Sequence, residues 1–297
     1  MNKKLKRIQS TILRWYKTTG RKFLWRRTRN PYRILISEIM LQQTQASRVV
    51  EKYPTFLKRF PNFSSLARAQ KPSVVKAWRG MGYNNRAIRL HQLANIVIRQ
   101  YHGRLPQTVE MLDDLPGIGT YTAHAIACFA FGQQVPAVDT NVRRILQRLF
   151  TQKNTRRDIW RIAWDVLPHG RAYDWNQALF DFGARVCTQR NPQCAICPVH
   201  KHCPSAFKIR TIRNTRAKRE PGRGGIPNRI YRGRVVETLR NLKAGRSLSA
   251  SQLGKQVKQN YTKRDSAWLR RLLHQLESDH IVSLRQGPST VRVTLAK

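Results

Sequence analysis

Four of the five cysteines in this chain of 297 residues lie close together, at Cys187, Cys194, Cys197 and Cys203, with the spacing C-x6-C-x2-C-x5-C. Four thiolates this near in sequence can converge on one inorganic centre without ligands from distant parts of the fold. The compact spacing favours a 4Fe-4S cluster. A structural zinc site is the alternative, but four-cysteine zinc sites usually pair two C-x2-C knuckles across a longer gap, and only one knuckle is present. Disulfides are disfavoured because the cysteine count is odd and no secretory signal precedes the chain.

The chain is strongly basic. Lys and Arg number 57 against 15 Asp and Glu, which gives a formal charge of +42 and an isoelectric point near 11.5. A charge of this size exceeds what solubility requires and indicates a polyanionic partner whose binding weakens steeply with salt. A generally basic, solvated surface is the alternative. No apolar run has transmembrane length and no lipidation signal is present, so we expect nucleic acid rather than a membrane as the partner.

Apolar periodicity predicts an all-helical body over residues 1–207. Apolar residues recur three and four positions apart between short Pro or Gly breaks, beginning with Leu5, Ile8 and Ile12. The first segment therefore predicts a folded helix rather than a transit peptide. Residues 208–228 are rich in Arg, Lys, Gly and Pro and predict a linker.

The pattern changes over residues 229–297, where three helices are followed by two short strands. The helices are expected over 230–242, 248–257 and 267–276, and the strands over 281–284 and 291–295. Three helices and a hairpin are typical of a winged helix, a variant of the helix-turn-helix. Since 208–297 holds 22 basic and five acidic residues, a net +17, we expect it to add phosphate contacts. A winged helix that binds protein is the alternative.

Two further stretches of the helical body carry candidate functional residues. The segment 115–123 joins two helical patterns through Gly117 and Gly119, and glycines let a backbone turn tightly and approach another backbone closely. This predicts a helix-hairpin-helix whose amide groups grip an anion, although a plain helix-helix turn would have the same glycines. About twenty residues later Asp139 precedes the basic pattern that begins at Arg143. An N-cap is the commonest role of an Asp in that position.

Residues 1–207 resemble the helix-hairpin-helix DNA glycosylases, and most closely the MutY-type adenine DNA glycosylases. The resemblance rests on separated motifs in the same order: Pro31-Tyr32, residues 37–45 (SEIMLQQTQ), 80–83 (GMGY), 115–122, 138–141 (VDTN), 176–183 (NQALFDFG) and the four cysteines. It implies a mainly α, two-lobed glycosylase fold with a cluster loop at 187–203, followed here by a small α+β winged-helix domain. It also implies a 4Fe-4S cluster and the removal of a flipped adenine, mispaired with G or 8-oxoguanine.

The resemblance also assigns roles to residues of this sequence. It implies that Glu38 protonates the adenine ring and that Asp139 faces the developing sugar cation, assisted by Tyr121 and Asn141. The residues that it places on the base or the duplex are Arg26, Gln43, Thr44, Tyr83, Gln177, Gly117 and Gly119. Cys187, Cys194, Cys197 and Cys203 would hold the cluster.

These residue types suit the reaction. Adenine is a poor leaving anion, so an acid must supply a proton, and the oxocarbenium-like sugar needs a nearby negative charge. Glu38 is flanked by Ile36, Ile39 and other apolar residues, which favours its protonated form, whereas Asp139 can stay ionised through hydrogen bonds. An exposed glutamate on a helix surface is the alternative for Glu38.

The sequence departs from the family pattern at three points, and two other functions stay open. Tyr121 stands where endonuclease-type relatives have a lysine, so a monofunctional enzyme is expected. Asn84 replaces a frequent second tyrosine, and a winged helix stands where a β-rich, 8-oxoguanine-reading domain usually follows. A glycosylase for thymine, uracil or a damaged base and a non-catalytic DNA-binding protein are the other hypotheses. We expect an intracellular, nucleoid-associated monomer that acts on double-stranded DNA with a mismatch or lesion.

Overall fold

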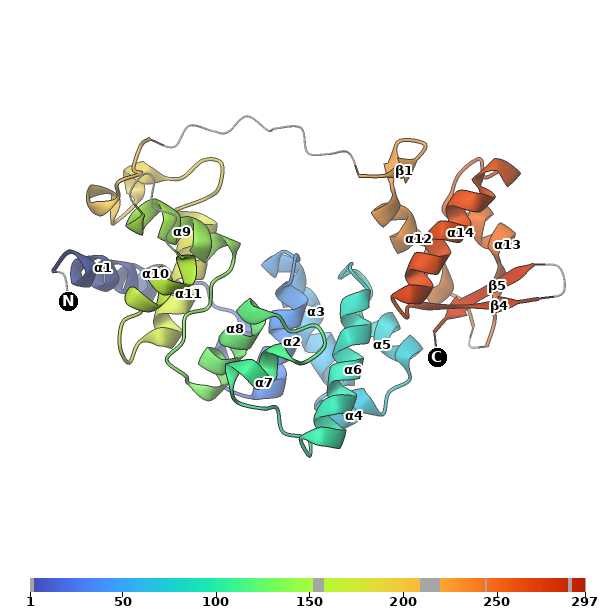
Figure 1. Cartoon of the computed structure of the whole chain (residues 1–297), viewed down its shortest axis with the longest axis horizontal. Coiled ribbons are helices and arrows are strands. Elements are labelled where there is room, and N and C mark those ends of the chain that lie inside the picture. The colour runs from blue at the N-terminus through green and yellow to red at the C-terminus, as the bar shows by residue number, and fades with distance from the viewer. Residues whose placement is uncertain (1–2, 152–157, 209–219, 244, 288–289, 297) are drawn as a thin grey trace. The chain divides into compact units, whose positions relative to one another are not determined.

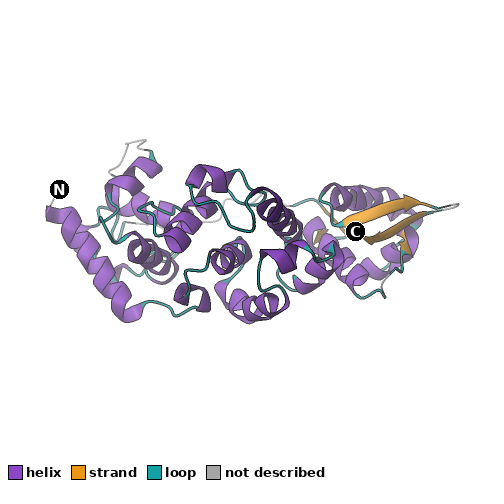
Figure 2. Ribbon diagram, turned by 90° about the horizontal axis from the view of Figure 1, so that it is seen from below, coloured by secondary structure: helices purple, strands orange, loops and turns teal. Residues whose placement is uncertain are grey.

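The computed structural model describes residues 3–151, 158–208, 220–243, 245–287 and 290–296. Helices dominate these residues, and the longest strands lie near the C-terminus (Figure 1, Figure 2). The chain forms two compact units. The first unit is Met1–Glu38 with Leu105–Thr215, and the second unit is Ile39–Arg104 with Arg216–Lys297. None of the described helices is both long and apolar enough to span a membrane.

The first unit is built from helices. They are α1 (Lys3–Thr19), η1 (Leu24–Arg27), the first part of α2 (Pro31–Leu41), α7 (Val109–Asp113), α8 (Thr120–Phe131), α9 (Thr140–Phe150), α10 (Ile159–Asp165), α11 (Ala172–Arg185), η2 (Cys194–Ile196) and η3 (His200–His202). Ile8 and Ile12 of α1 are buried in one apolar core with Leu146 of α9 and Phe182 of α11. The predicted first helix is therefore confirmed, because its apolar stripe is the face that the core covers.

The helix-hairpin-helix is present between α7 and α8. Gly117 has φ of +85°, in the left-handed region that favours glycine, and the Thr120 hydroxyl donates to the Asp113 carboxylate at 3.1 Å across the hairpin. Gly119 differs, since its φ of −130° is open to any residue. A Cβ at Gly119 would have no described atom within 4 Å. The protein itself therefore gives no steric reason for glycine at that position.

The second unit combines four helices of the central sequence with the C-terminal elements. The central helices are α3 (Ala46–Arg59), α4 (Phe63–Ala67), α5 (Lys71–Ala77) and α6 (Asn85–Gln100). The C-terminal elements are β1 (Gly222–Arg223), β2 (Ile226–Pro227), α12 (Asn228–Arg240), β3 (Leu248–Ser249), α13 (Ala250–Val257), η4 (Lys263–Asp265), α14 (Ser266–Ser278), β4 (Val282–Gln286) and β5 (Val291–Leu295).

The C-terminal elements form the predicted three helices and hairpin, and the mainly α fold class with a small α+β region is confirmed. β3, β5 and β4 form an antiparallel sheet in that order, with Val293 of β5 opposite both Leu248 and Leu284. The expected helix over 248–257 was wrong at its start. Ser249 accepts a hydrogen bond from the Gln252 amide N–H as an N-cap, so the helix begins at Ala250 and the two preceding residues are free to pair with β5.

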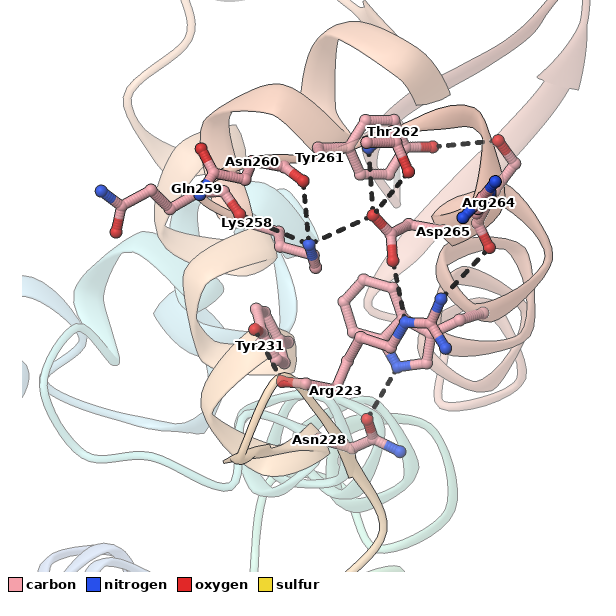
Figure 3. Close-up of polar contacts among 12 residues, drawn as sticks. Arg223, Asn228, Tyr231, Lys258, Gln259, Asn260, Tyr261, Thr262, Arg264 and Asp265 are labelled. Carbon is pink, nitrogen blue, oxygen red and sulfur yellow. Dashed lines mark hydrogen bonds and ion pairs between the residues drawn. The ribbon is translucent and has the colours of Figure 1, made fainter.

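A buried carboxylate fixes the turn between α13 and α14 (Figure 3). Asp265 is 4% exposed and accepts hydrogen bonds from the Thr262 N–H at 3.0 Å and the Arg223 Nε at 2.8 Å, with the Lys258 ammonium at 3.1 Å. The Thr262 N–H and these two cations lower the pKa of Asp265. The turn is therefore held by an ionised group across the ordinary pH range.

The end of the predicted linker is folded, which corrects its boundary. Residues 222–227 form the β1–β2 hairpin, because Gly224 and Gly225 both adopt positive φ, the conformation that a two-residue hairpin turn demands. Residues 209–219 of that linker lie outside the described part of the chain. The apolar core of the C-terminal elements also includes Val75 of α5 and Ile88 of α6. The division into three domains at 207 and 228 stays a prediction.

Candidate active site

The first unit contains a buried carboxyl group. Glu38, on α2, is 4% exposed and accepts a hydrogen bond from the Tyr121 hydroxyl, on α8, at 3.0 Å. The pKa of Glu38 is raised from 4.5 to about 7, mainly by burial and to a lesser extent by the charge of Asp139, while the Tyr121 hydrogen bond opposes the shift. The apolar environment predicted for Glu38 is confirmed, and the exposed-surface alternative was wrong.

Asp139 is the N-cap of α9. Its carboxylate accepts hydrogen bonds from the Val142 N–H at 2.7 Å and from the Asn141 amide at 3.0 Å. Burial raises the pKa of Asp139, whereas these hydrogen bonds and the charge of Arg144 oppose the rise. The capping alternative is correct, yet the cap also places a second carboxylate close enough to Glu38 to influence its pKa. The two carboxyl groups therefore belong to one electrostatic site.

Arg26 is held near Glu38 by Asp181, a residue that the sequence did not single out. Asp181 of α11 is fully buried and accepts two hydrogen bonds from the Arg26 guanidinium, at 2.8 and 2.9 Å, and one from the Arg21 Nε at 2.7 Å. The charge of Arg26 lowers the pKa of Glu38, which places the guanidinium near that group. The Arg26 Nε is buried and has no hydrogen-bond partner among the described residues. Gln177, also on α11, is 5% exposed.

Arg144 connects this site to the cysteine loop. Its guanidinium donates to the Asn141 side-chain oxygen at 2.8 Å, to the Gly183 carbonyl at 2.7 Å and to the Cys187 carbonyl at 2.9 Å. Asn141 in turn donates to Asp139. A Cβ at Gly183 would lie 2.7 Å from that of Asn141, so glycine is needed for the two helices to approach this closely.

The four cysteines of the 187–203 loop line one cavity together with Ile145, Leu149 and other residues of α9 and the loop. None of the four forms a disulfide. Among the described residues no group of three or more His, Cys, Asp or Glu side chains is arranged to hold a single metal ion. A cube of iron and sulfide is larger than one ion, so its ligands lie around a cavity rather than at a point. Four thiols that line one cavity are a donor set that fits such a cube.

The second unit holds two exposed loops that carry the other predicted DNA-contacting residues. Gln43 and Tyr83 adopt φ of +53° and +43°, a left-handed conformation that is uncommon outside glycine. Tyr83 is 55% exposed. The Thr44 hydroxyl hydrogen-bonds the Gln42 carbonyl at 3.3 Å, and the Met81 carbonyl lies 3.5 Å from it. Strain of this kind persists only where the surroundings hold it.

Arg86, a residue that sequence reasoning missed, holds both loops. It is 7% exposed, and its guanidinium donates to the carbonyls of Ile39, Met40 and Gln42 on one side and of Met81 and Gly82 on the other, at 2.6 to 3.2 Å. It also donates to the Thr44 hydroxyl at 3.0 Å. Burial lowers the pKa of Arg86 to about 10, so the group remains charged at neutral pH.

Replacing Arg86 is expected to destabilise the protein strongly. Arg86→Met leaves several buried carbonyl oxygens without donors, so the free energy of unfolding should fall by about 3 kcal/mol. Urea unfolding measures the change. Arg89→Met, at an exposed position of the same helix, is the control and should change stability by less than about 0.5 kcal/mol. Equal stability of the two variants would show that Arg86 does not hold the loops.

Comparisons with known proteins agree with this architecture. Residues 36–169 match the family model of the HhH-GPD superfamily base excision DNA repair proteins. The chain is 41% identical over 198 residues to the adenine DNA glycosylase of Mycobacterium tuberculosis, covering 64% of this chain and 65% of that protein. It is 38% identical over 216 residues to the thymine/uracil-DNA glycosylase of Methanothermobacter thermautotrophicus, covering 71% of this chain and 98% of that one.

A solved structure shares the fold. A thermostable thymine-DNA glycosylase superposes with a TM-score of 0.67 at 37% identity, over 70% of this chain and 99% of that chain. The chain spans slightly less than two thirds of the mycobacterial protein, but nearly all of the archaeal one. On these matches and on the helix-hairpin-helix described above, the chain belongs to the HhH-GPD superfamily of base excision DNA repair proteins.

Proposed function

We propose that this chain is a monofunctional adenine DNA glycosylase, which removes adenine mispaired with G or 8-oxoguanine by hydrolysing its N-glycosidic bond. The observation that supports this most is Glu38, a buried carboxyl whose pKa of about 7 keeps a large protonated fraction at neutral pH. Together with Asp139 it gives two carboxyls with different duties, an acid and an anion.

In the proposed reaction Glu38 acts first. The adenine is turned out of the duplex into the first unit, and the Glu38 carboxyl donates its proton to the ring as the bond between the base and the sugar C1′ breaks. The electrons of that bond leave with the base, so adenine departs neutral. The Tyr121 hydroxyl donates to Glu38 Oε2, so the proton that is transferred to adenine would be carried by Oε1.

Asp139 acts on the sugar. The deoxyribose becomes oxocarbenium-like as the base departs, and a carboxylate held by the Val142 N–H and the Asn141 amide stabilises that positive charge. Water then adds to C1′ and loses a proton, which leaves an abasic site. Because Tyr121 offers a phenol and not an amine, no Schiff base forms and the strand stays intact.

Two polar side chains near Glu38 support adenine as the substrate. The Arg26 Nε–H is a buried donor without a partner among the described residues, and Gln177 is buried nearby on the helix that carries Asp181. Adenine offers ring nitrogens as acceptors and one exocyclic amino group as a donor. A guanidinium donor and an amide together can satisfy both kinds of group, which motivates their assignment to the adenine edges.

Contacts with double-stranded DNA are proposed for three regions. Gly117 and Gly119 would let a phosphate approach the backbone at the start of α8, and the open space beside Gly119 supports this role. Gln43 and Tyr83 would enter the stack from loops that Arg86 makes rigid. The winged helix would add phosphate contacts through its net positive charge.

We propose that Cys187, Cys194, Cys197 and Cys203 hold a 4Fe-4S cluster, supported by the cavity that they share. The chemistry assigned to the cluster is structural. It would fix the 187–203 loop, to which Arg144 and Arg148 donate hydrogen bonds from α9.

Release of thymine or uracil is a second candidate, favoured by the archaeal relative that this chain matches over nearly its whole length. A duplex panel decides between the two. Single-turnover reactions would place A, T or U opposite each base, including 8-oxoguanine. We expect adenine release opposite G and 8-oxoguanine, with alkali-labile but unbroken product strands. Release of thymine or uracil without adenine would refute the proposal, and borohydride trapping of the native protein would refute its monofunctional part.

A further inference from the structure

The exposed face of α1, in the first unit, carries basic residues that the proposed chemistry does not use. Lys6, Arg14 and Lys17, called the α1 cations below, are all exposed. Together with Ser10 they recur three or four positions apart, which is the spacing of one helix face. The opposite face, which includes Ile12, is buried in the core of the unit. The α1 cations are therefore directed to solvent.

A groove of about 740 Å³, called the α1 groove below, is lined by the α1 cations on one side and by Pro168 and Arg171 on the other. These two parts of the unit are fixed relative to each other, since α1 packs against α11 (Figure 1). The Gln9 side chain, which is 5% exposed, also lines the groove and donates to the Val166 carbonyl at 3.0 Å. The groove is therefore built on a rigid frame.

The positive charge of the α1 groove is not compensated. Its lining includes one acidic residue, Asp174, whose carboxylate is paired with Arg171 at 3.0 Å. Among the described residues no carboxylate pairs with any of the α1 cations. Residues 1–37 of the sequence contain no Asp or Glu. Like charges that line one groove raise the local concentration of anions, so we expect an anionic ligand.

The spacing of the α1 cations indicates a chain of phosphates rather than a single phosphate. An α-helix rises about 1.5 Å per residue, so Lys6 and Lys17 are roughly 16 Å apart along its axis. One phosphate cannot contact both. Phosphates follow each other every ~3.4 Å along the axis of one duplex strand, so about five of them fall within that length. A membrane surface is disfavoured, because none of the exposed large apolar side chains of the described residues lines the groove.

We propose that the α1 groove is a second binding site for the backbone of double-stranded DNA. None of its lining residues is among those assigned to the excised base or to the duplex around it. A protein with two such sites captures a second DNA segment before it releases the first, which speeds its transfer between segments. The inference goes beyond the proposed glycosylase chemistry and requires only that the chain binds double-stranded DNA.

The dissociation rate of a labelled duplex tests for the second site. The full-length protein is bound to a short fluorescent duplex without a mismatch and is then mixed with increasing concentrations of the same duplex without the label. With one site the dissociation rate is independent of competitor concentration, because the protein must release one duplex before it binds another. With two sites we expect the rate to rise roughly threefold for a tenfold increase in competitor at low salt.

A triple variant assigns this rise to the α1 groove. Lys6→Gln, Arg14→Gln and Lys17→Gln together remove the α1 cations and leave the buried face of the helix unchanged. The dissociation rate of this groove variant should be independent of competitor concentration. Its single-turnover rate of adenine release should equal that of the native protein, because the α1 cations do not belong to the active site.

The control is a triple variant with the same change of net charge. Lys58→Gln, Arg99→Gln and Arg104→Gln remove three cations that are exposed in the second unit and do not line the α1 groove. The control should keep the rise of the dissociation rate with competitor. The control and the groove variant should bind a short mismatched duplex with affinities within about twofold of each other, since both lose the same long-range attraction.

Three results would overturn the inference. The first is a native dissociation rate that does not depend on competitor concentration. The second is a groove variant that keeps the rise, which would assign the capture to another surface such as the winged helix. The third is a groove variant that binds the short mismatched duplex much more weakly than the control, which would make the groove part of the primary site. Failure of the proposed function is distinguishable, since it shows as absence of adenine release by the native protein.

Discussion

Glu38→Gln is expected to lower the single-turnover rate of adenine release by about two to four decades. The amide has nearly the shape of the carboxyl and can still accept the Tyr121 hydrogen bond, but it cannot deliver a proton to the departing base. Binding of a mismatched duplex should change little. Rates are measured at saturating enzyme on a duplex with adenine opposite guanine. Glu51→Gln, at an exposed position of α3, is the control and should behave as the native protein. A near-native rate for Glu38→Gln would remove Glu38 from the mechanism.

Glu38→Gln should raise the stability of the folded protein although it lowers the rate of adenine release. The folded state raises the pKa of Glu38 from 4.5 to about 7, so it binds a proton that the unfolded chain releases between these values. The native protein therefore loses stability as pH rises through that window, by about 3 kcal/mol for this group. The glutamine side chain of the variant does not titrate. The variant should gain stability relative to the native protein between pH 4 and pH 8. Such a gain would show that the variant is not inactive because it unfolds.

Cys197→Ser is expected to abolish iron and sulfide binding and to weaken DNA affinity together. The native protein should contain about four iron and four sulfide per chain, since the four thiols surround one cavity and a missing ligand opens the cluster. Metal and sulfide analysis of protein prepared without oxygen measures both. Cys128→Ala is the control, because Cys128 is buried in α8 away from the loop and should leave the iron content unchanged. Stoichiometric zinc without iron in the native protein would contradict the cluster.

Local patterns predicted much of the fold. The cysteine spacing, the glycine hairpin and the three helices with a hairpin at the C-terminus all depend on neighbours in sequence, so their elements could be anticipated. The apolar flanks of Glu38 similarly predicted its burial. The local sequence did not predict β3, because this strand of two residues depends on pairing with β5, more than 40 positions later.

The missed residues all act through long-range contacts. Asp181 holds Arg26 from 155 positions away, and Arg86 gathers carbonyls from two loops about 40 positions apart. A basic chain has too many arginines for sequence alone to show which one is buried. Arg240 and Asn84 are 156 positions apart, and nothing in either local sequence indicates that they meet.

The central claim is that a buried, protonated Glu38 is the acid that releases the base, and the pH dependence of single-turnover excision tests it most directly. Only the protonated carboxyl can act, so the rate constant at saturating enzyme should fall tenfold per pH unit above a midpoint near 7, the pKa of Glu38, and should level off below it. A rate that stays constant from pH 6 to 9, or that rises with pH, would contradict the claim.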